Sequence, residues 1–242
     1  MHLEKLQAIV LSTTDYGDSG RIAALFTLEH GRLSGFARGA RNSRKRFGPA
    51  LETFARIDLQ LAFKDGLSSL RQADVITLYP GIRSDLGGIA QALYACELVA
   101  CVTPEGQPLP RLYRLLVAYL ERLESGSEVN IDRRLFEINL LNILGYRPSL
   151  ENCSRCGSVF AGSGALMQQG GELICRFCAA SGRHIAAPVL QGLLLCLSTS
   201  RFGSVQFSGD ELLQAGVLLD EAVAAHSGRK LKTLEFLQQS TE

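Results

Sequence analysis

The sequence predicts an α+β protein of several parts, in which a small closed β-barrel precedes a helical region that is interrupted by a four-cysteine segment. Three observations predict this arrangement. Apolar residues alternate with a period of two over residues 1–80. After Pro80-Gly81 the apolar period becomes that of an α-helix. Two Cys-x-x-Cys pairs then interrupt the helical pattern within residues 149–183.

Five segments of the first part have the pattern of strands with one buried face. The clearest alternation occupies residues 56–63, whose predicted inward residues are Ile57, Leu59, Leu61 and Phe63. In residues 21–28 the apolar face is formed by Ile22, Ala24, Phe26 and Leu28. The other candidate strands are residues 5–13, 32–39 and 67–78. Five short strands favour a closed barrel, which has no exposed edge. From periodicity alone, an SH3-like barrel fits nearly as well as an OB-fold.

The rest of the chain is predicted to be mainly helical. Helices are expected at residues 86–102, 111–124 and 132–144, from Pro188 onward, and at residues 208–225. Residues 228–237 form a short, basic and amphipathic segment. The predicted domains are the barrel (1–80), a first helical part (81–148), an insertion that contains the four clustered cysteines (149–183) and a second helical part (184–242).

The four clustered cysteines have the spacing of a metal site. Cys153, Cys156, Cys175 and Cys178 form a C-x2-C-x18-C-x2-C pattern. Each Cys-x-x-Cys pair forms a tight turn, a knuckle, that directs two thiolates at one point, and two knuckles together provide the tetrahedral ligands that zinc prefers. Four thiolates leave no coordination position for water or substrate. We therefore expect one structural Zn²⁺ per chain within a zinc ribbon. The other three cysteines, Cys96, Cys101 and Cys196, are expected to be buried as small apolar residues.

Positive charge is concentrated in one early segment. Between Glu29 and Glu52 there are six Arg or Lys residues and no carboxylate; of the chain's 25 basic and 24 acidic residues, this leaves 19 basic against 24 acidic elsewhere. Cations beside an aromatic ring suit single-stranded nucleic acid, because the cations hold phosphates and the ring stacks on a base. The predicted nucleic-acid-binding residues are Arg32, Phe36, Arg38, Arg41, Arg44, Lys45 and Arg46.

The sequence contains no pattern of a catalytic centre. The four histidines are scattered, and neither a P-loop nor a nucleophile-elbow motif occurs. Asp15 and Asp18 lack a third ligand for a nuclease metal, so we expect a binding protein and no enzyme. The short apolar run near the start is not a signal peptide, and no stretch is long enough to cross a membrane, so we expect a cytoplasmic protein.

Several segments in this order resemble the RecO family of bacterial recombination mediators. They are Ala8-Ile9-Val10-Leu11, residues 16–22, residues 36–41, residues 144–148 leading into the first cysteine pair, residues 170–175 and residues 228–237. The resemblance covers essentially the whole chain. It implies an N-terminal OB-fold, a helical domain and an inserted zinc ribbon.

The resemblance also implies a function. Family members bind single- and double-stranded DNA, anneal complementary strands and help RecA load on DNA that is coated by the single-strand-binding protein SSB. The implied partners are RecR, the acidic and apolar C-terminal tail of SSB, and functionally RecA and RecF, with activity at the nucleoid. For the SSB tail, an apolar groove rimmed by arginine is expected, with Arg133 and Arg134 as candidates.

Two other functions fit the same residues. Barrels and zinc ribbons also occur in RNA-binding proteins. A zinc-containing adaptor that recruits another protein is the second alternative. Binding to matched DNA and RNA strands distinguishes the first from DNA repair, and absence of nucleic-acid binding would favour the second.

Overall fold

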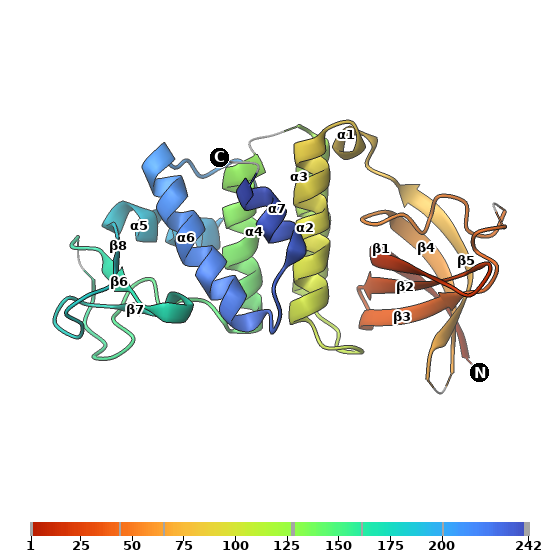
Figure 1. The fold of residues 1–242 in the computed structure, drawn as a ribbon, viewed down its shortest axis with the longest axis horizontal. Coiled ribbons are helices and arrows are strands. Elements are labelled where there is room, and N and C mark those ends of the chain that lie inside the picture. The colour runs from red at the N-terminus through yellow and green to blue at the C-terminus, as the bar shows by residue number, and fades with distance from the viewer. Residues whose placement is uncertain are drawn as a thin grey trace. The chain divides into compact units, whose positions relative to one another are not determined.

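A computed structural model describes residues 2–43, 45–64, 66–126, 129–160, 162–199 and 201–239. The chain divides into two compact units. The first contains residues 1–126 and 231–242, and the second contains residues 127–230. Each unit is described by itself below, and Figure 1 labels the elements of both.

The first unit begins with five strands that close into a barrel. They are β1 (His2–Tyr16), β2 (Gly20–Thr27), β3 (Gly31–Ala37), β4 (Arg56–Phe63) and β5 (Ser68–Thr77). Their order around the barrel is β1-β2-β3-β5-β4. The β3–β5 pair is parallel, and the other described pairs are antiparallel. All five predicted strand segments thus form strands.

The barrel core explains one correct and one wrong prediction of a buried face. In β4, Ile57, Leu59 and Leu61 lie in the core as predicted. In β2, the core residues are instead Ala23 and Leu25. The outer face of β2 is also apolar, because it is covered by another part of the unit: the ring of Phe26 packs on Tyr113 of the helix at Pro110–Glu124, with centroids 6.1 Å apart.

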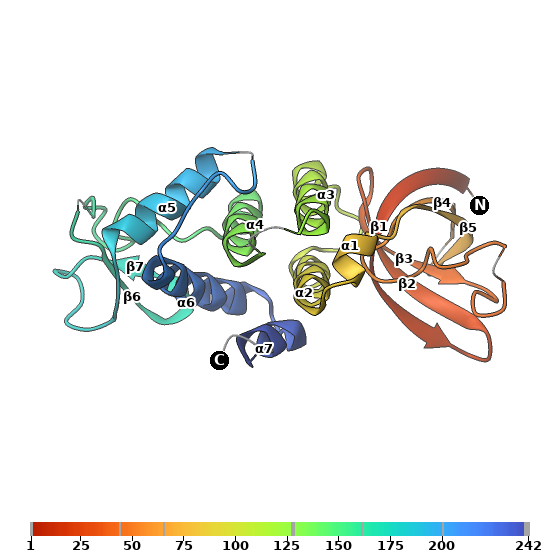
Figure 2. The same cartoon turned by 90° about the horizontal axis from the view of Figure 1, so that it is seen from above.

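Four helices complete the first unit: α1 (Pro80–Arg83), α2 (Leu86–Val102), α3 (Pro110–Glu124) and α7 (Lys232–Gln239). Figure 2 shows α1, α2 and α3 beside the barrel. The buried Cys96 of α2 lies against β1, with its Sγ 3.9 Å from the carbonyl oxygen of Val10. Glu97 of the same helix accepts hydrogen bonds from the backbone N–H groups of Lys232 and Thr233, at 3.3 and 3.0 Å. The carboxylate thereby caps α7 and holds it to α2.

The second unit consists of helices and a small sheet. Its helices are α4 (Val129–Leu144), α5 (Ala187–Ser198) and α6 (Gly209–His226). The three-stranded sheet, in the order β7-β6-β8, is formed by β6 (Ala165–Met167), β7 (Leu173–Ile174) and β8 (Arg183–Ile185), with a 3-10 turn (Gln169–Gly171) between β6 and β7. Strands β6 and β7 pair as an antiparallel hairpin across Gly170, which agrees with the expected zinc ribbon. No strand was predicted at β8. The predicted helical segment 81–148 is divided between the units, α1 to α3 in the first and α4 in the second.

Among the described residues, no helix is both long and apolar enough to cross a membrane.

Candidate nucleic-acid interface and metal centre

The four predicted metal ligands lie together in the second unit. All four Sγ atoms are within 4.8 Å of one another, and those of Cys156 and Cys175 are 3.7 Å apart. A tetrahedral zinc ion with Zn–S bonds of about 2.3 Å places its sulfur atoms about 3.8 Å apart. The group can therefore hold one tetrahedral metal ion, and its soft thiol donors suit zinc.

Local backbone structure creates this cluster. In each knuckle a tight turn closes: the N–H of Gly157 donates to the carbonyl of Cys153, and the N–H of Cys178 donates to that of Cys175, both at 2.9 Å. Gly157 has a φ of 73°, which glycine adopts at little cost. The N–H of Cys175 also donates to the Sγ of Cys153 at 3.3 Å, which joins the two knuckles directly.

The surroundings of the thiols shift their pKa values in opposite directions. Desolvation raises the pKa of Cys153, but backbone N–H groups, first that of Cys156, outweigh it and lower the pKa to about 6. Hydrogen bonds to Cys156 and Cys175, joined by desolvation, raise the pKa of Cys178 to about 12. In the metal-bound form all four residues act as thiolates, so metal binding releases the remaining protons.

The predicted basic surface lies at one end of the barrel. There the ring of Tyr16, at the end of β1, meets that of Phe36 in β3 edge to face, with centroids 5.7 Å apart. Tyr16 is 60% exposed. Gly20 faces Phe36 so closely that a Cβ at this position would lie 2.6 Å from the ring. The sequence therefore places a glycine where the aromatic pair needs room.

Cations surround this aromatic pair. Arg21 in β2 is paired across the β1–β2 ladder with Asp15, and their side chains form an ion pair at 2.8 Å. Arg41 approaches the same carboxylate at 3.8 Å, and its backbone N–H donates to the carbonyl of Ser19 at 3.0 Å. The loop that follows β3 is thus attached to the β1–β2 turn. Arg41 and Arg21 remain 46% and 36% exposed, so their guanidinium groups still face solvent.

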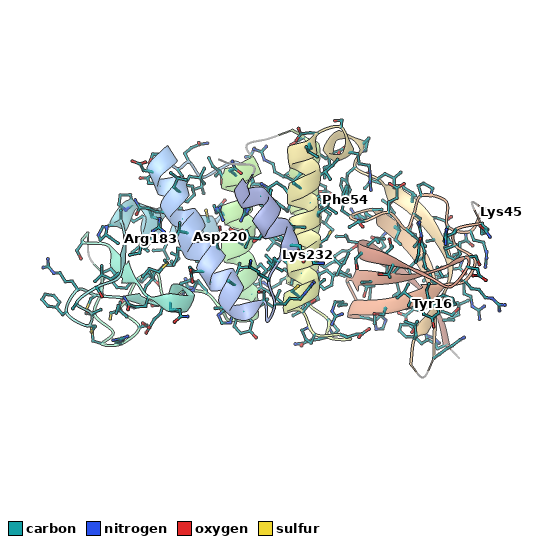
Figure 3. All side chains as sticks on the ribbon, in the orientation of Figure 1. Tyr16, Lys45, Phe54, Arg183, Asp220 and Lys232 are labelled. Atoms are coloured by element: carbon teal, nitrogen blue, oxygen red, sulfur yellow. The ribbon has the colours of Figure 1, made fainter. Side chains whose placement is uncertain are left out.

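The other loop cations lie beside this attachment. Arg46 donates to the carbonyl of Arg38 at 2.9 Å and to the hydroxyl of Ser43 at 3.1 Å, which keeps the loop closed. Arg38, Lys45 and Arg46 are exposed. Figure 3 shows Tyr16 and Lys45 on the side of the barrel that faces away from α3. Arg44 lies outside the described residues.

We define the basic surface as Tyr16, Arg21, Phe36, Arg38, Arg41, Lys45 and Arg46. Two aspartates contact these cations: the carboxylate of Asp15 pairs with Arg21 and Arg41, and the backbone carbonyl of Asp18 accepts a hydrogen bond from Arg41.

Arg32 does not lie with the other predicted residues. Its Nε donates to the carbonyl of Thr103 at 2.9 Å, and its own carbonyl accepts from the N–H of Gly106 at 2.8 Å. Arg32 therefore lies at the end of β3 that contacts the α2–α3 connection. At about 3.3 Å per residue, this end is roughly 20 Å from Arg38. Arg32 and Arg38 are close in the sequence, but the length of β3 separates them in the structure.

The expectation that Arg133 and Arg134 rim an exposed groove is wrong. Arg133 donates to Glu137 at 2.8 Å, and Arg134 donates to the other oxygen of the same carboxylate at 2.7 Å. Both also bond Asp220 of α6 at 2.9 Å. Their side chains are 5% and 12% exposed, while that of Glu137 is fully buried. These arginines join α4 to α6 because a buried carboxylate requires paired cations.

Two members of the basic surface had weak or no signals in the sequence. Tyr16 lies beyond the predicted strand 5–13, so its place at the end of a 15-residue strand was not foreseen. Arg21 lies eleven positions before Arg32, the first cation of the basic segment, and only the β2–β3 register, which opposes Arg21 to Ala37, brings it beside the loop.

Comparisons with known proteins agree with this architecture. The family described as Recombination protein O N terminal matches residues 1–79, and that described as Recombination protein O C terminal matches residues 83–235. "DNA repair protein RecO" of Pelobacter propionicus is 61% identical over 240 residues, covering 99% of this chain and 98% of that protein. The protein of the same name from Geobacter sulfurreducens is 49% identical over 242 residues, covering all of both chains. That of Myxococcus xanthus is 37% identical over 235 residues, covering 96% of each. The matches span both units, and the chain therefore belongs to the RecO family.

Proposed function

We propose that this protein is a recombination mediator of DNA repair, acting on the nucleoid in the cytoplasm. It binds single- and double-stranded DNA, anneals complementary strands and, with RecR, helps RecA load on SSB-coated single strands. The observation that carries the proposal is the basic surface, in which the Tyr16–Phe36 pair is bordered by five exposed or half-exposed cations. Membership of a family whose relatives are named DNA repair protein supports it.

We infer that the barrel is an OB-fold. OB-folds bind oligonucleotides on the face of strands 2 and 3 and with the loop between strands 1 and 2. In this barrel β2 contributes Arg21, β3 contributes Phe36, and the β1–β2 turn begins directly after Tyr16. The strand order β1-β2-β3-β5-β4 with a parallel β3–β5 pair supports the same assignment.

The chemistry of the basic surface suits binding without sequence preference. Exposed guanidinium and ammonium groups attract phosphates of any sequence, and aromatic rings stack on any base. Annealing requires that the repulsion between two phosphate chains be reduced, and a cationic surface reduces it. The proposed role of the metal is structural, because four thiolates complete the coordination shell of zinc.

We propose that the SSB tail binds a different groove from the one expected at Arg133. A groove of about 290 Å³ between α2 and α7 is lined by Leu86, Ile89, Ala90, Leu93, Lys232 and Thr233. Leu86, Ile89 and Leu93 form one stripe of α2, which would hold an apolar anchor. The exposed ammonium group of Lys232 would pair with the tail's carboxylates.

One experiment tests the main proposal. Complementary single strands, each coated with SSB, are mixed with the purified protein, and duplex formation is followed with and without the SSB tail. Acceleration that depends on the tail is expected. Equal or tighter binding to matched RNA would favour the RNA-binding alternative, and absence of any nucleic-acid binding at moderate salt would favour an adaptor.

A further inference from the structure

The second unit presents one aromatic ring almost entirely to solvent. Phe177 is 85% exposed, the highest value among the large hydrophobic side chains that the structure describes. It lies in the second knuckle, between Cys175 and Cys178. A phenyl ring in contact with water forgoes the stabilisation that burial would give. The position therefore favours a function in binding over one in folding.

The backbone under this ring is fixed on both sides. The turn is closed by the 2.9 Å hydrogen bond from the N–H of Cys178 to the carbonyl of Cys175. The N–H of Cys175 is held by the Sγ of Cys153 at 3.3 Å. A ring on a fixed turn is preorganised, so a ligand that stacks on it orders little additional chain.

One guanidinium group borders the ring, and a second contacts the backbone of the same turn. That of Arg176 lies 5.1 Å from the ring centroid of Phe177. That of Arg155, which is 52% exposed, donates to the carbonyl of Cys178 at 3.3 Å and lies 3.8 Å from Glu172. An exposed aromatic ring with adjoining arginines is the combination that holds an unpaired base and its phosphate. An apolar protein surface would fit this site poorly, because binding it would remove water from the guanidinium groups of Arg155 and Arg176 without giving them new partners.

We propose that Phe177 and Arg176 form a second contact for single-stranded nucleic acid, in which an unpaired base stacks on the ring and a phosphate is held by the guanidinium group. The inference rests on the proposed function and deepens it. The basic surface belongs to residues 1–126, whereas this contact belongs to residues 127–230. One chain would then offer two contacts for single strands, one in each unit, so that it could bind both strands that are to be annealed.

The absence of tryptophan from the sequence allows a direct test. Phe177→Trp introduces a single indole whose emission is quenched when a base stacks on it. We expect titration with an oligothymidine to quench this emission by about half. Val159→Trp is the matched control, because Val159 belongs to the same segment and is 70% exposed. Its emission should change little. Arg176→Ala in the Phe177→Trp background should raise the oligothymidine concentration at half-maximal quenching about threefold.

Tyr16→Trp, on the basic surface, separates failure of this inference from failure of the proposed function. Quenching of Tyr16→Trp without quenching of Phe177→Trp overturns the second contact and leaves the proposed function in place. Quenching at neither position overturns both. Equal quenching of Val159→Trp and Phe177→Trp also counts against the inference, since it would indicate general proximity of DNA. Measured metal content of each variant verifies that the knuckles are intact.

Discussion

The ring of Tyr16 meets the ring of Phe36 edge to face, with their centroids 5.7 Å apart and their planes at 81°. Because Tyr16 is 60% exposed, its outer face is available to a base. We expect Tyr16→Ala to weaken binding of a short single strand about tenfold, since stacking contributes about 1–3 kcal/mol per base. Fluorescence anisotropy of a labelled oligonucleotide measures this. Leu3→Ala, at the opposite end of β1 and 54% exposed, is the control that should bind normally.

The cations of the loop after β3 should determine how binding depends on salt. Joint substitution of Arg41, Arg44, Lys45 and Arg46 by Ala should reduce affinity for all sequences alike. Each lost phosphate contact should lower the slope of log affinity against log salt by about 0.7. The control replaces Arg111 and Arg114, two exposed arginines of α3. An unchanged slope in the loop variant would locate the binding surface elsewhere.

Removal of the metal should loosen the second unit. Pure protein is expected to contain one zinc ion per chain, and Cys156→Ser or a strong chelator should remove it. We expect faster amide exchange and proteolysis in residues 149–185, while the barrel strands stay protected. Hydrogen exchange with mass spectrometry distinguishes the two regions. Metal content far below one per chain in the unmodified protein would contradict a zinc site.

A negative charge in the α2–α7 groove should prevent binding of the SSB tail. Leu86→Glu places a carboxylate at a position that is 70% exposed, so the fold should tolerate it. We expect at least a tenfold loss of affinity for a peptide with the tail sequence, and a smaller loss for Lys232→Ala. Leu213→Glu, on the 66% exposed position of α6, is the matched control. Equal peptide binding by all these variants would exclude this groove.

The buried carboxylate of Glu137 should be essential to the second unit's stability. Glu137→Gln removes the buried carboxylate that pairs with both Arg133 and Arg134 and leaves them their ion pairs with Asp220, so the free energy of unfolding should fall by about 3–5 kcal/mol. Chemical denaturation measures the change. Glu211→Gln, in the exposed first turn of α6, should lower the free energy of unfolding much less. A small effect at Glu137 would mean that the ion pairs are not required for folding.

The sequence predicted element type better than the position of individual side chains. Period-two and helical patterns located the strands of the barrel and the main helices, and cysteine spacing identified a cluster that the fold closes around a single point. Both signals are local, because a strand's alternation and a knuckle's turn depend on residues near in sequence. The short strand β8 has no such pattern in its three residues, and it was missed.

The periodicity and charge of the sequence did not predict contacts between segments that are distant in the sequence. Arg133 and Arg134 look like exposed cations of an amphipathic helix until α6 brings Asp220 beside them. Arg32 appears to belong with Arg38, although a carbonyl 71 residues later in the chain accepts its hydrogen bond. Charge alone therefore does not distinguish a cation that faces a ligand from one that joins two elements.

The capping of α7 by Glu97 has a topological consequence. The hydrogen bonds from Thr233 to Glu97 hold the end of the chain in the first unit, so residues 127–230 are an insertion between two segments of that unit. The chain therefore connects the unit that contains the four cysteines to the first unit twice. A single protease cut in either connection would leave two fragments that stay associated, and only cleavage of both connections would release residues 127–230 from the first unit.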